Sequence, residues 1–432
     1  MRLTNVARLA LPLGQLRSLS TRITDGPGRP LPISFDQRRH VERGDRPGSW
    51  MAVTFRLPTG VDDARLADAW LRVVRRHGSL SSVFADDGTG GLALRSAEVV
   101  ADGWVDHDAA AGQHPRDVLR EVLDRSCRPF SAPAHRLCVL TPGPGEPDRR
   151  PVAIIASDHA HVDMWSMLVL ARDLLQAIET DGELPPVAAF AAHTAVLEAL
   201  PPAPPGITRR WGEILAAGDG SMPVFPFDLG DVSEPRPEVV EVHDVLDARG
   251  TALFEAASAR SGVRPISTAL AIMTAVTQRL GGGPLRAVFP VHSRSEERWR
   301  DAVGWFITNS VIECTEPSPA ACARAVRDAI ALGSHPLAPI MAPYGGMPEG
   351  PGMFALSWLD GRRLPPGPDI PELSSVSASI RTTGVMIWFI INDTGLHLRC
   401  RYPDTAEARA NVGGWIAALL DEFRAAAEPA AS

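Results

Sequence analysis

The sequence predicts a mixed α/β protein built from two similar lobes, and three observations carry this prediction. The chain has 432 residues, which is too long for one ordinary hydrophobic core and suits two domains of roughly 200 residues each. Strand-like and helix-like patterns alternate in the same style in both halves. Residues 184–237 are rich in proline, as expected of an interdomain crossing. We therefore predict lobes over residues 1–190 and 238–432, joined by a crossing over residues 191–237.

Apolar periodicity, capping residues and turn residues define the elements of the first half. One helix, for example, is predicted to begin at Asp62 and Asp63 because an aspartate caps a helix well and apolar residues then repeat on one face. The predicted elements are a first strand or arm at 1–16, a helix start at 32–37, strands at 49–57, 79–84, 92–100, 134–140 and 152–156, and helices at 62–76, 115–127 and 164–180.

The second half repeats this alternation after the proline-rich segment. A hairpin is predicted over residues 384–402, with its turn at Asp393 and Thr394. The other predicted elements are strands at 239–246, 285–290 and 353–358, and helices at 251–261, 267–280, 319–332 and 406–427.

Composition narrows the functional classes. The net charge is −8 and no long basic run occurs, so nucleic acid is not an expected partner. No stretch approaches the ~18 uncharged apolar residues that span a bilayer. Arg8 interrupts the apolar stretch of the N-terminus, which argues against a signal peptide. The 5 cysteines are scattered without a CxxC pair, so we expect reduced, buried thiols in a cytoplasmic protein. The GxGxxG, P-loop and GxSxG motifs are absent.

The segment from Asp158 to Met167 carries the strongest candidate for chemistry. His159 and Asp163 form an HxxxD arrangement directly behind the apolar run 152–156. A buried strand fixes the backbone, the carboxylate orients the segment, and the imidazole can accept a proton near neutral pH. Taken alone, a histidine after a strand is more often a satisfied structural residue.

The neighbours of His159 leave several roles open. A strand-like backbone would point His161 the same way as His159. His161 then either lines a substrate channel or, as we expect, supports the site from behind or lies in solvent. Ser166 is either a donor to an oxyanion or a helix cap, and the backbone N–H groups at that helix start are an equal oxyanion candidate. A metal site formed by Asp158, His159, His161 and Asp163 is the weaker alternative because no partner motif such as HExxH accompanies them.

Four segments, in order along the chain, resemble motifs of one known family. They are Ser-Phe-Asp-Gln at 34–37, Arg-His-Gly-Ser-Leu at 76–80, the HxxxD core at 159–163, and Val-Gly-Trp-Phe-Ile-Thr-Asn at 303–309. Together they resemble the condensation-domain superfamily. Within it, segments 209–226, 304–306 and 354–360 are similar to the polyketide-associated (PapA-type) acyltransferases, including those that acylate sulfated trehalose.

The resemblance implies a fold and an activity. The expected fold is a V-shaped pseudo-dimer of two chloramphenicol-acetyltransferase-like lobes with a tunnel between them. The expected reaction transfers an acyl group from a CoA or carrier-protein thioester to a hydroxyl acceptor in secondary-metabolite or lipid biosynthesis, with no cofactor and no metal. A cytoplasmic monomer is expected.

The resemblance also distributes roles among the candidate residues. His159 would be the general base and Asp163 would hold the loop. Trp165 and Trp305 are core or interface residues, and Trp305 is also a candidate wall of an acyl pocket. Asn309 is either a channel residue or a turn residue, and Ser357 is a further substrate-binding candidate.

Three residues depart from the family pattern. Asp158 stands where condensation domains have a first histidine, Met164 replaces the glycine after the motif aspartate, and Ser81 replaces an arginine that pairs with that aspartate. Asp163 therefore needs another cation, and the candidates are Arg294 and Arg381. Two alternatives stay open. One is amide formation with an amine acceptor, against which the missing first histidine argues. The other is a non-catalytic binding protein that retains the fold, which Met164 and Ser81 favour and the intact His159 opposes.

Overall fold

The computed structural model describes residues 2–24, 26, 28–364 and 370–428, and its chain divides into two compact units. The first unit comprises Met1–Ala199, Arg294–Ile307 and Pro365–Ser379, and the second comprises Leu200–Ser293, Thr308–Leu364 and Ile380–Ser432. Neither unit is continuous in sequence. The lobe boundaries at residues 190 and 237 stay a prediction, while the mixed α/β class is confirmed.

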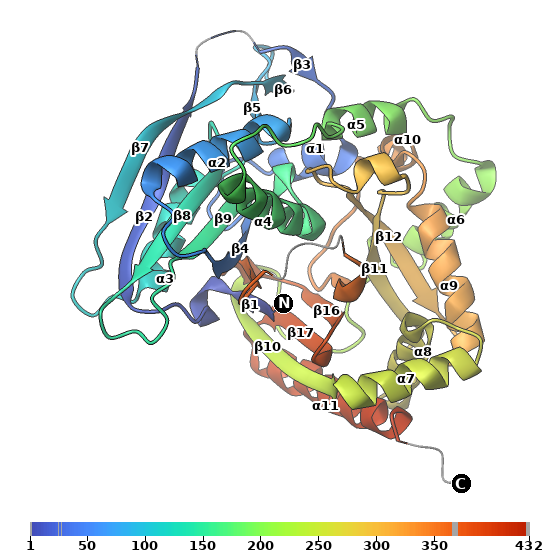
Figure 1. The fold of residues 1–432 in the computed structure, drawn as a ribbon. Helices are drawn as coiled ribbons and strands as arrows, with labels where there is room; N and C mark the ends of the chain where they lie inside the picture. Colours follow the sequence, from blue (N-terminus) through green and yellow to red (C-terminus); the bar gives the residue numbers. More distant parts are fainter. Residues whose placement is uncertain (1, 25, 27, 365–369, 429–432) are drawn as a thin grey trace. The chain divides into compact units, whose positions relative to one another are not determined.

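The described part of the first unit has a seven-stranded sheet in the order β1-β14-β4-β9-β8-β2-β7 and a three-stranded sheet in the order β3-β6-β5 (Figure 1). The strands are β1 (Arg2–Asn5), β2 (Gly14–Ile23), β3 (Pro30–Leu31), β4 (Trp50–Arg56), β5 (Ser82–Asp86), β6 (Leu92–Ser96), β7 (Val99–His107), β8 (His135–Pro142), β9 (Val152–Asp158) and β14 (Ser374–Ser377). Strand β9 lies between β4 and β8 and is buried over its whole length. This central position holds the backbone that leads into the HxxxD segment.

Helices α2 (Asp63–Arg76), α3 (Pro115–Ser126) and α4 (Met164–Glu179) begin and end close to the predicted positions. Helix α1 (Phe35–Val41) begins within the predicted helix start, and α5 (Phe190–Glu198) was not predicted. Asp62 caps α2 by accepting a hydrogen bond from the Arg65 N–H at 2.8 Å. Helices α2 and α4 pack against each other beside β8, β9 and β4 (Figure 1), and their apolar faces share one core with the sheet.

The second unit has its own seven-stranded sheet among its described residues, in the order β12-β11-β13-β16-β17-β10-β15. The strands are β10 (Arg236–Asp247), β11 (Leu285–His292), β12 (Ile307–Cys314), β13 (Phe354–Asp360), β15 (Arg381–Thr382), β16 (Val385–Asn392) and β17 (Gly395–Pro403). The helices are α6 (Pro205–Ala216), α7 (Ala248–Arg260), α8 (Pro265–Arg279), α9 (Pro319–Leu332), α10 (Leu337–Met341) and α11 (Ala406–Ala426). The predicted hairpin is confirmed, since Asn392 pairs with Gly395.

Three predictions about local structure were wrong. Residues 92–100 form two strands, β6 and β7, instead of one. The proline-rich crossing contains two helices, because prolines at 204 and 205 begin α6, where a missing N–H costs nothing, and none falls inside α5. The N-terminal arm is two strands separated by a short 3₁₀ turn at Val6–Arg8.

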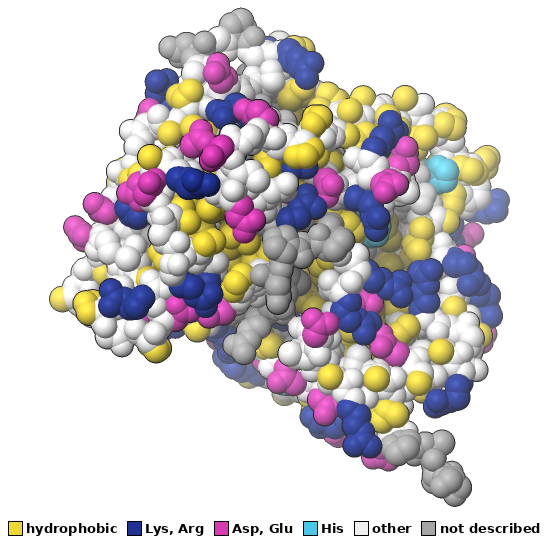
Figure 2. Space-filling view, viewed as in Figure 1, with side chains coloured by type: hydrophobic (Ala, Val, Ile, Leu, Met, Phe, Trp, Pro, Cys, Tyr) yellow, Lys and Arg dark blue, Asp and Glu magenta, His cyan; other side chains and the backbone are white. Residues whose placement is uncertain are grey.

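The described chain contains no helix that is long and apolar enough to cross a membrane. Its five cysteines are all buried and free. Acidic and basic side chains are mixed over most of the face drawn in Figure 2, with a gathering of basic side chains over α9.

Candidate functional site

Asp163 is a fully buried charged residue of the HxxxD segment, and Arg294 is its partner. The side chain of Asp163 is 0% exposed and that of Arg294 is 1% exposed. Two guanidinium nitrogens donate to the two carboxylate oxygens, Nη1 to Oδ2 at 2.5 Å and Nη2 to Oδ1 at 3.0 Å. This two-point geometry is the strong form of an arginine–carboxylate pair. Of the two predicted candidates, Arg294 therefore supplies the cation, and Arg381 lies in the second unit.

Backbone donors complete the surroundings of the Asp163 carboxylate. It accepts from the Ser166 N–H at 2.7 Å, which makes it the N-cap of α4, and from the Phe306 N–H at 3.1 Å. Burial alone would raise the pKa of Asp163, but the charge and hydrogen bonds of Arg294 outweigh it and the pKa lies below its ordinary value. Asp163 thus ties the start of α4 to segment 294–306.

Ser166 belongs to the same network. Its hydroxyl donates to the Gly304 carbonyl at 2.9 Å and accepts from the Gly304 N–H at 3.0 Å and from Arg294 Nη2 at 2.9 Å. Because the hydroxyl proton is donated to the Gly304 carbonyl, Ser166 has no proton left to donate to an oxyanion in this arrangement. Trp165 is likewise fixed to this segment, since its indole N–H donates to the Arg300 carbonyl at 2.7 Å.

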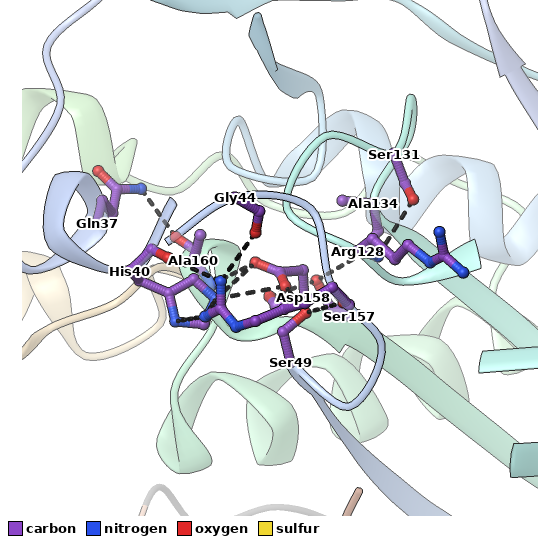
Figure 3. Close-up of polar contacts among 11 residues, drawn as sticks. Gln37, His40, Gly44, Ser49, Arg128, Ser131, Ala134, Ser157, Asp158 and Ala160 are labelled. Atoms are coloured by element: carbon purple, nitrogen blue, oxygen red, sulfur yellow. Dashed lines mark hydrogen bonds and ion pairs between the residues drawn. The ribbon is translucent and has the colours of Figure 1, made fainter. Parts of the chain in front are cut away.

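Asp158 is the hub of a second buried network (Figure 3). Its carboxylate accepts from the Ser49 hydroxyl at 2.5 Å and from the Ala160 N–H at 2.9 Å, and it lies 3.3 Å from His40 Nε2. Burial opposes ionisation of Asp158, but His40 and Ser49 stabilise the carboxylate and its pKa is lowered. Arg46 in turn lies 3.1 Å from Nδ1 of His40. Asp158 therefore anchors the turn that carries His159.

His159 is the first residue of a short 3₁₀ turn, His159–His161, that follows directly on β9. Its backbone N–H donates to the Ser49 carbonyl at 3.0 Å. Within the described chain, ring nitrogen Nδ1 is buried and makes no hydrogen bond to another residue, while the side chain as a whole keeps partial exposure. Burial and the neighbouring His40 lower the pKa of His159 below its ordinary value of 6.5. The imidazole is therefore neutral at pH 7 and able to accept a proton.

Trp305 forms a wall beside this imidazole. The ring centroids of Trp305 and His159 are 4.2 Å apart, and those of Trp305 and His40 are 5.2 Å apart. Trp305 belongs to segment 294–306, which the Asp163–Arg294 ion pair holds in place. The ion pair therefore fixes the position of the indole that contacts the His159 imidazole. The role of Trp305 as a wall of an acyl pocket stays a prediction.

The structure corrects the expectation for His161. The 3₁₀ turn breaks the strand-like alternation, so His161 points into the interior, where Nδ1 lies 2.8 Å from the Ser79 carbonyl and the ring packs on Phe84. The Ser34–Gln37 segment supports the same turn. Ser34 and Gln37 form a reciprocal capping box for α1, and the Gln37 amide donates to the Ala160 carbonyl at 2.8 Å.

Residues 76–80 have a structural role, and none of the hydrogen bonds of this segment within the described chain reaches the imidazole of His159. His77 Nε2 lies 2.8 Å from Oδ2 of the buried Asp173, and Arg76 lies 3.2 Å from the same oxygen. The Ser79 hydroxyl donates to the Val303 carbonyl at 2.9 Å. This segment therefore links α2 and α4 to the loop that carries Trp305.

Two site candidates lie in the second unit. Asn309 is on β12, and Ser357 is on β13, opposite Trp388 of β16. Their roles stay predictions.

The residues considered as metal ligands have different hydrogen-bond partners. Asp158 contacts His40 and Ser49, His161 contacts Ser79, and Asp163 contacts Arg294.

Sequence reasoning missed His40, Arg46 and Ser49. They precede the HxxxD segment by more than 100 residues, and only the pairing of β4 beside β9, with Trp50 opposite Asp158, brings them to it. The available clue was the replacement of a histidine by Asp158, because a buried carboxylate requires donors from elsewhere.

The lowered pKa of His159 predicts the pH dependence of activity. A base must be unprotonated, so the rate should rise as pH increases through the pKa and level off above it. Because burial and His40 lower that pKa, the acidic limb of kcat/KM should have its midpoint below the ordinary value of about 6.5. A rate measurement between pH 4.5 and 8 checks this, and a midpoint clearly above 6.5 would contradict it.

Gly304 predicts a second effect, because the loop passes Phe190 with no room for a side chain. A Cβ at this position would lie 2.2 Å from Cγ of Phe190, a buried ring. Gly304→Ala should therefore destabilise the protein by ~1–3 kcal/mol through overpacking and lower activity by displacing Trp305. Denaturant unfolding and rate measurements check both effects.

Gly414 provides the matched control for this substitution. It lies exposed in α11 with open space around its Cα, so Gly414→Ala should stabilise by about 0.5–1 kcal/mol. Equal unfolding midpoints for the two variants would contradict the close packing at Gly304.

Sequence relatives of this chain include acyltransferases. No family model matches the chain. Acyltransferase PapA3 of Mycobacterium tuberculosis is 24% identical over 449 aligned residues, covering 94% of this chain and 92% of PapA3. Trehalose-2-sulfate acyltransferase PapA2 of the same organism is 27% identical over 264 residues, covering 54% of this chain and 52% of PapA2.

Solved structures give the same result at the level of fold. A structure of PapA2 acyl transferase matches with a TM-score of 0.82 and 19% identity, covering 99% of this chain and 100% of that one. The first condensation domain of the calcium-dependent antibiotic synthetase matches with a TM-score of 0.70 and 14% identity, covering 94% and 98%.

The fold and these relatives define an acyltransferase with the two-lobed chloramphenicol-acetyltransferase-like fold. The chain is similar over nearly its whole length to a PapA-type acyltransferase and shares its fold with condensation domains. Both predictions made from the ordered motifs are confirmed.

Proposed function

We propose that this acyltransferase moves an acyl group from a CoA or carrier-protein thioester onto a hydroxyl, with His159 as the general base. The observation that supports this most is a neutral, partly exposed imidazole on a rigid turn, anchored by two separate buried carboxylates. Rigid support is what a positioned base needs, because catalytic geometry tolerates errors of only about half an ångström.

The chemical step uses one base twice. His159 accepts the proton of the acceptor hydroxyl as its oxygen attacks the thioester carbonyl and a C–O bond forms. The tetrahedral intermediate then collapses, the C–S bond breaks, and the protonated imidazole returns the proton to the departing sulfur. Such a base typically contributes roughly 10²–10⁴-fold to the rate. Asp163 is not needed as a proton carrier in this step, since its oxygens are occupied by Arg294 and by backbone N–H groups.

A hydroxyl acceptor is the better proposal for the second substrate. PapA2 is named for its action on trehalose-2-sulfate, whose remaining acceptor groups are hydroxyls. The position of the first histidine in amide-forming condensation domains is occupied here by Asp158, which is fully engaged with Ser49, His40 and the Ala160 N–H. Asp158 therefore holds the turn that carries His159, and this role is independent of whether the acceptor is an amine.

A paired-substrate assay tests this proposal. The protein is incubated with acyl-CoA and acyl-carrier thioesters of several chain lengths, together with trehalose or with a matched alcohol and amine such as 1-octanol and octylamine. Thiol release and product mass are followed together. We expect ester products and faster transfer to the alcohol than to the amine. Preferential amide formation would overturn the choice of acceptor, and no transfer from any thioester would overturn the proposed reaction.

A further inference from the structure

A polar hollow lies on the first unit, away from the network of Asp158 and Asp163. Leu19 of β2 and Leu137 of β8 belong to the hydrophobic core of this unit. Because side chains alternate along a strand, Ser18, Ser20 and Arg136 point to the opposite face of the sheet. Helix α3 packs on β2 and β8, and β7 is the edge strand beside β2 (Figure 1). Residues of α3 and β7 complete the lining of the hollow.

The hollow has a volume of about 340 Å³ and a polar lining made of Ser18, Ser20, His107, Arg125, Ser126 and Arg136. A water molecule needs only about 10–15 Å³ of such space. The hollow is therefore large enough for a small ligand, and its lining combines two arginines and a histidine with the apolar side chains of Val105 and Val122.

The two arginines are not neutralised by the described residues. Arg136 Nη1 donates to the Leu19 carbonyl at 3.0 Å, and its buried Nε has no hydrogen-bond partner in the described chain. Arg125 Nε donates to the Glu121 carbonyl at 3.1 Å, leaving its two terminal nitrogens available. Neither guanidinium forms an ion pair with a carboxylate of the described chain.

His107 lies within the field of both cations. Its Nε2 is 2.9 Å from the Ser18 hydroxyl. Burial lowers the pKa of His107, and Arg125 and Arg136 lower it further, against a smaller opposing effect of Asp106. The hollow thus has two positive charges, an imidazole and a serine hydroxyl at Ser20, and none of its described lining residues is acidic.

We propose that this hollow binds the phosphate group of a small molecule at a site separate from the HxxxD segment. Guanidinium groups bind phosphate through paired N–H donors, and hydroxyl donors from a second direction suit a tetrahedral anion better than a planar carboxylate. The remaining volume, bordered by Val105 and Val122, accommodates part of the organic group of a phosphate monoester. This inference does not depend on the acyl-transfer proposal.

Titration with defined anions tests the site in the full-length protein. Inorganic phosphate, glycerol 3-phosphate and uncharged glycerol are added at constant ionic strength set with chloride, and binding is followed by calorimetry and by the NMR titration of the His107 ring. We expect saturable binding of the phosphorylated compounds only, with an increase in the pKa of His107 because the anion offsets the two arginines. Tighter binding of the monoester than of phosphate would mean that the organic group also contacts the site. Equal affinities would make inorganic phosphate the ligand.

Matched charge-removing variants locate the binding. Arg125→Gln and Arg136→Gln should each weaken phosphate binding about tenfold or more, because each removes a charge-assisted hydrogen bond. Arg120→Gln, which removes the same charge from the exposed side of α3, should change affinity less than about twofold at this ionic strength. Arg125 is exposed, so its variant should fold normally even if Arg136→Gln does not. The absence of saturable phosphate binding, or equal affinities of Arg125→Gln and Arg120→Gln, would overturn the proposal.

Discussion

His159→Ala should lower kcat for acyl transfer by about 10²–10⁴-fold, the usual contribution of a positioned general base. The fold should be retained, because the ring makes no hydrogen bond to another described residue and only its contacts with Trp305 and His40 are lost. KM for the thioester should change little, since the base acts on the acceptor proton. Steady-state rates at several concentrations of donor and acceptor separate these quantities.

Two controls make this result specific to the base. His335→Ala, on the loop between α9 and α10, should leave kcat within about twofold, because His335 takes part in neither the Asp158 nor the Asp163 network. His159→Ala should also lose the acidic limb of the pH profile, because the group that titrates is gone. A variant that kept at least a tenth of the wild-type kcat and the same pH profile would remove His159 from the mechanism.

Arg294→Met should destabilise the first unit by about 3–5 kcal/mol, because it leaves the carboxylate of Asp163 buried without a cation. Arg298→Met serves as the control in the same segment. Arg298 and its partner Glu296 are both about half exposed, and such pairs contribute only about 0–1 kcal/mol. Denaturant unfolding of both variants, with slopes compared, measures the difference.

A double variant separates charge burial from lost packing. Asp163→Asn removes the charge that Arg294→Met leaves unpaired, so the double variant should be more stable than Arg294→Met alone. Acid unfolding provides a second readout. The pKa of Asp163 lies below its ordinary value of 3.8, so its stabilisation is complete above that value and is lost as pH falls through the lower folded pKa. Additive effects of the two substitutions would contradict a buried ion pair.

The fold was largely predictable because its elements are specified locally. Apolar periodicity and Asp62 locate α2, and the uniformly apolar run 152–156 locates the central strand β9. The errors arose where local patterns are ambiguous. Prolines at helix starts were taken for helix breakers, and the join between β6 and β7 carries no strong turn residue. The discontinuous units could not be predicted, since they depend on which distant segments pack together.

The sequence located the candidate site along the chain, but its geometry was harder to predict. The order of the motifs pointed to His159 and Asp163, and the missing arginine at Ser81 pointed to a substitute cation, with Arg294 as one of two candidates. The inward turn of His161 was not predictable, because the change from strand to 3₁₀ turn occurs at a single residue and is imposed by Asp158 and Gln37. The role of His40 likewise depends on contacts that sequence spacing does not contain.

A rapid-quench single-turnover experiment tests the central claim most directly. Enzyme in excess is mixed with acyl thioester, with and without acceptor, and thiol, product and intact protein mass are followed together in the wild type and in His159→Ala. The account predicts that wild-type thiol release requires the acceptor, equals ester formation at every time point and leaves the protein mass unchanged, while His159→Ala leaves the thioester intact. An acylated protein, or transfer by His159→Ala at the wild-type rate, would contradict it.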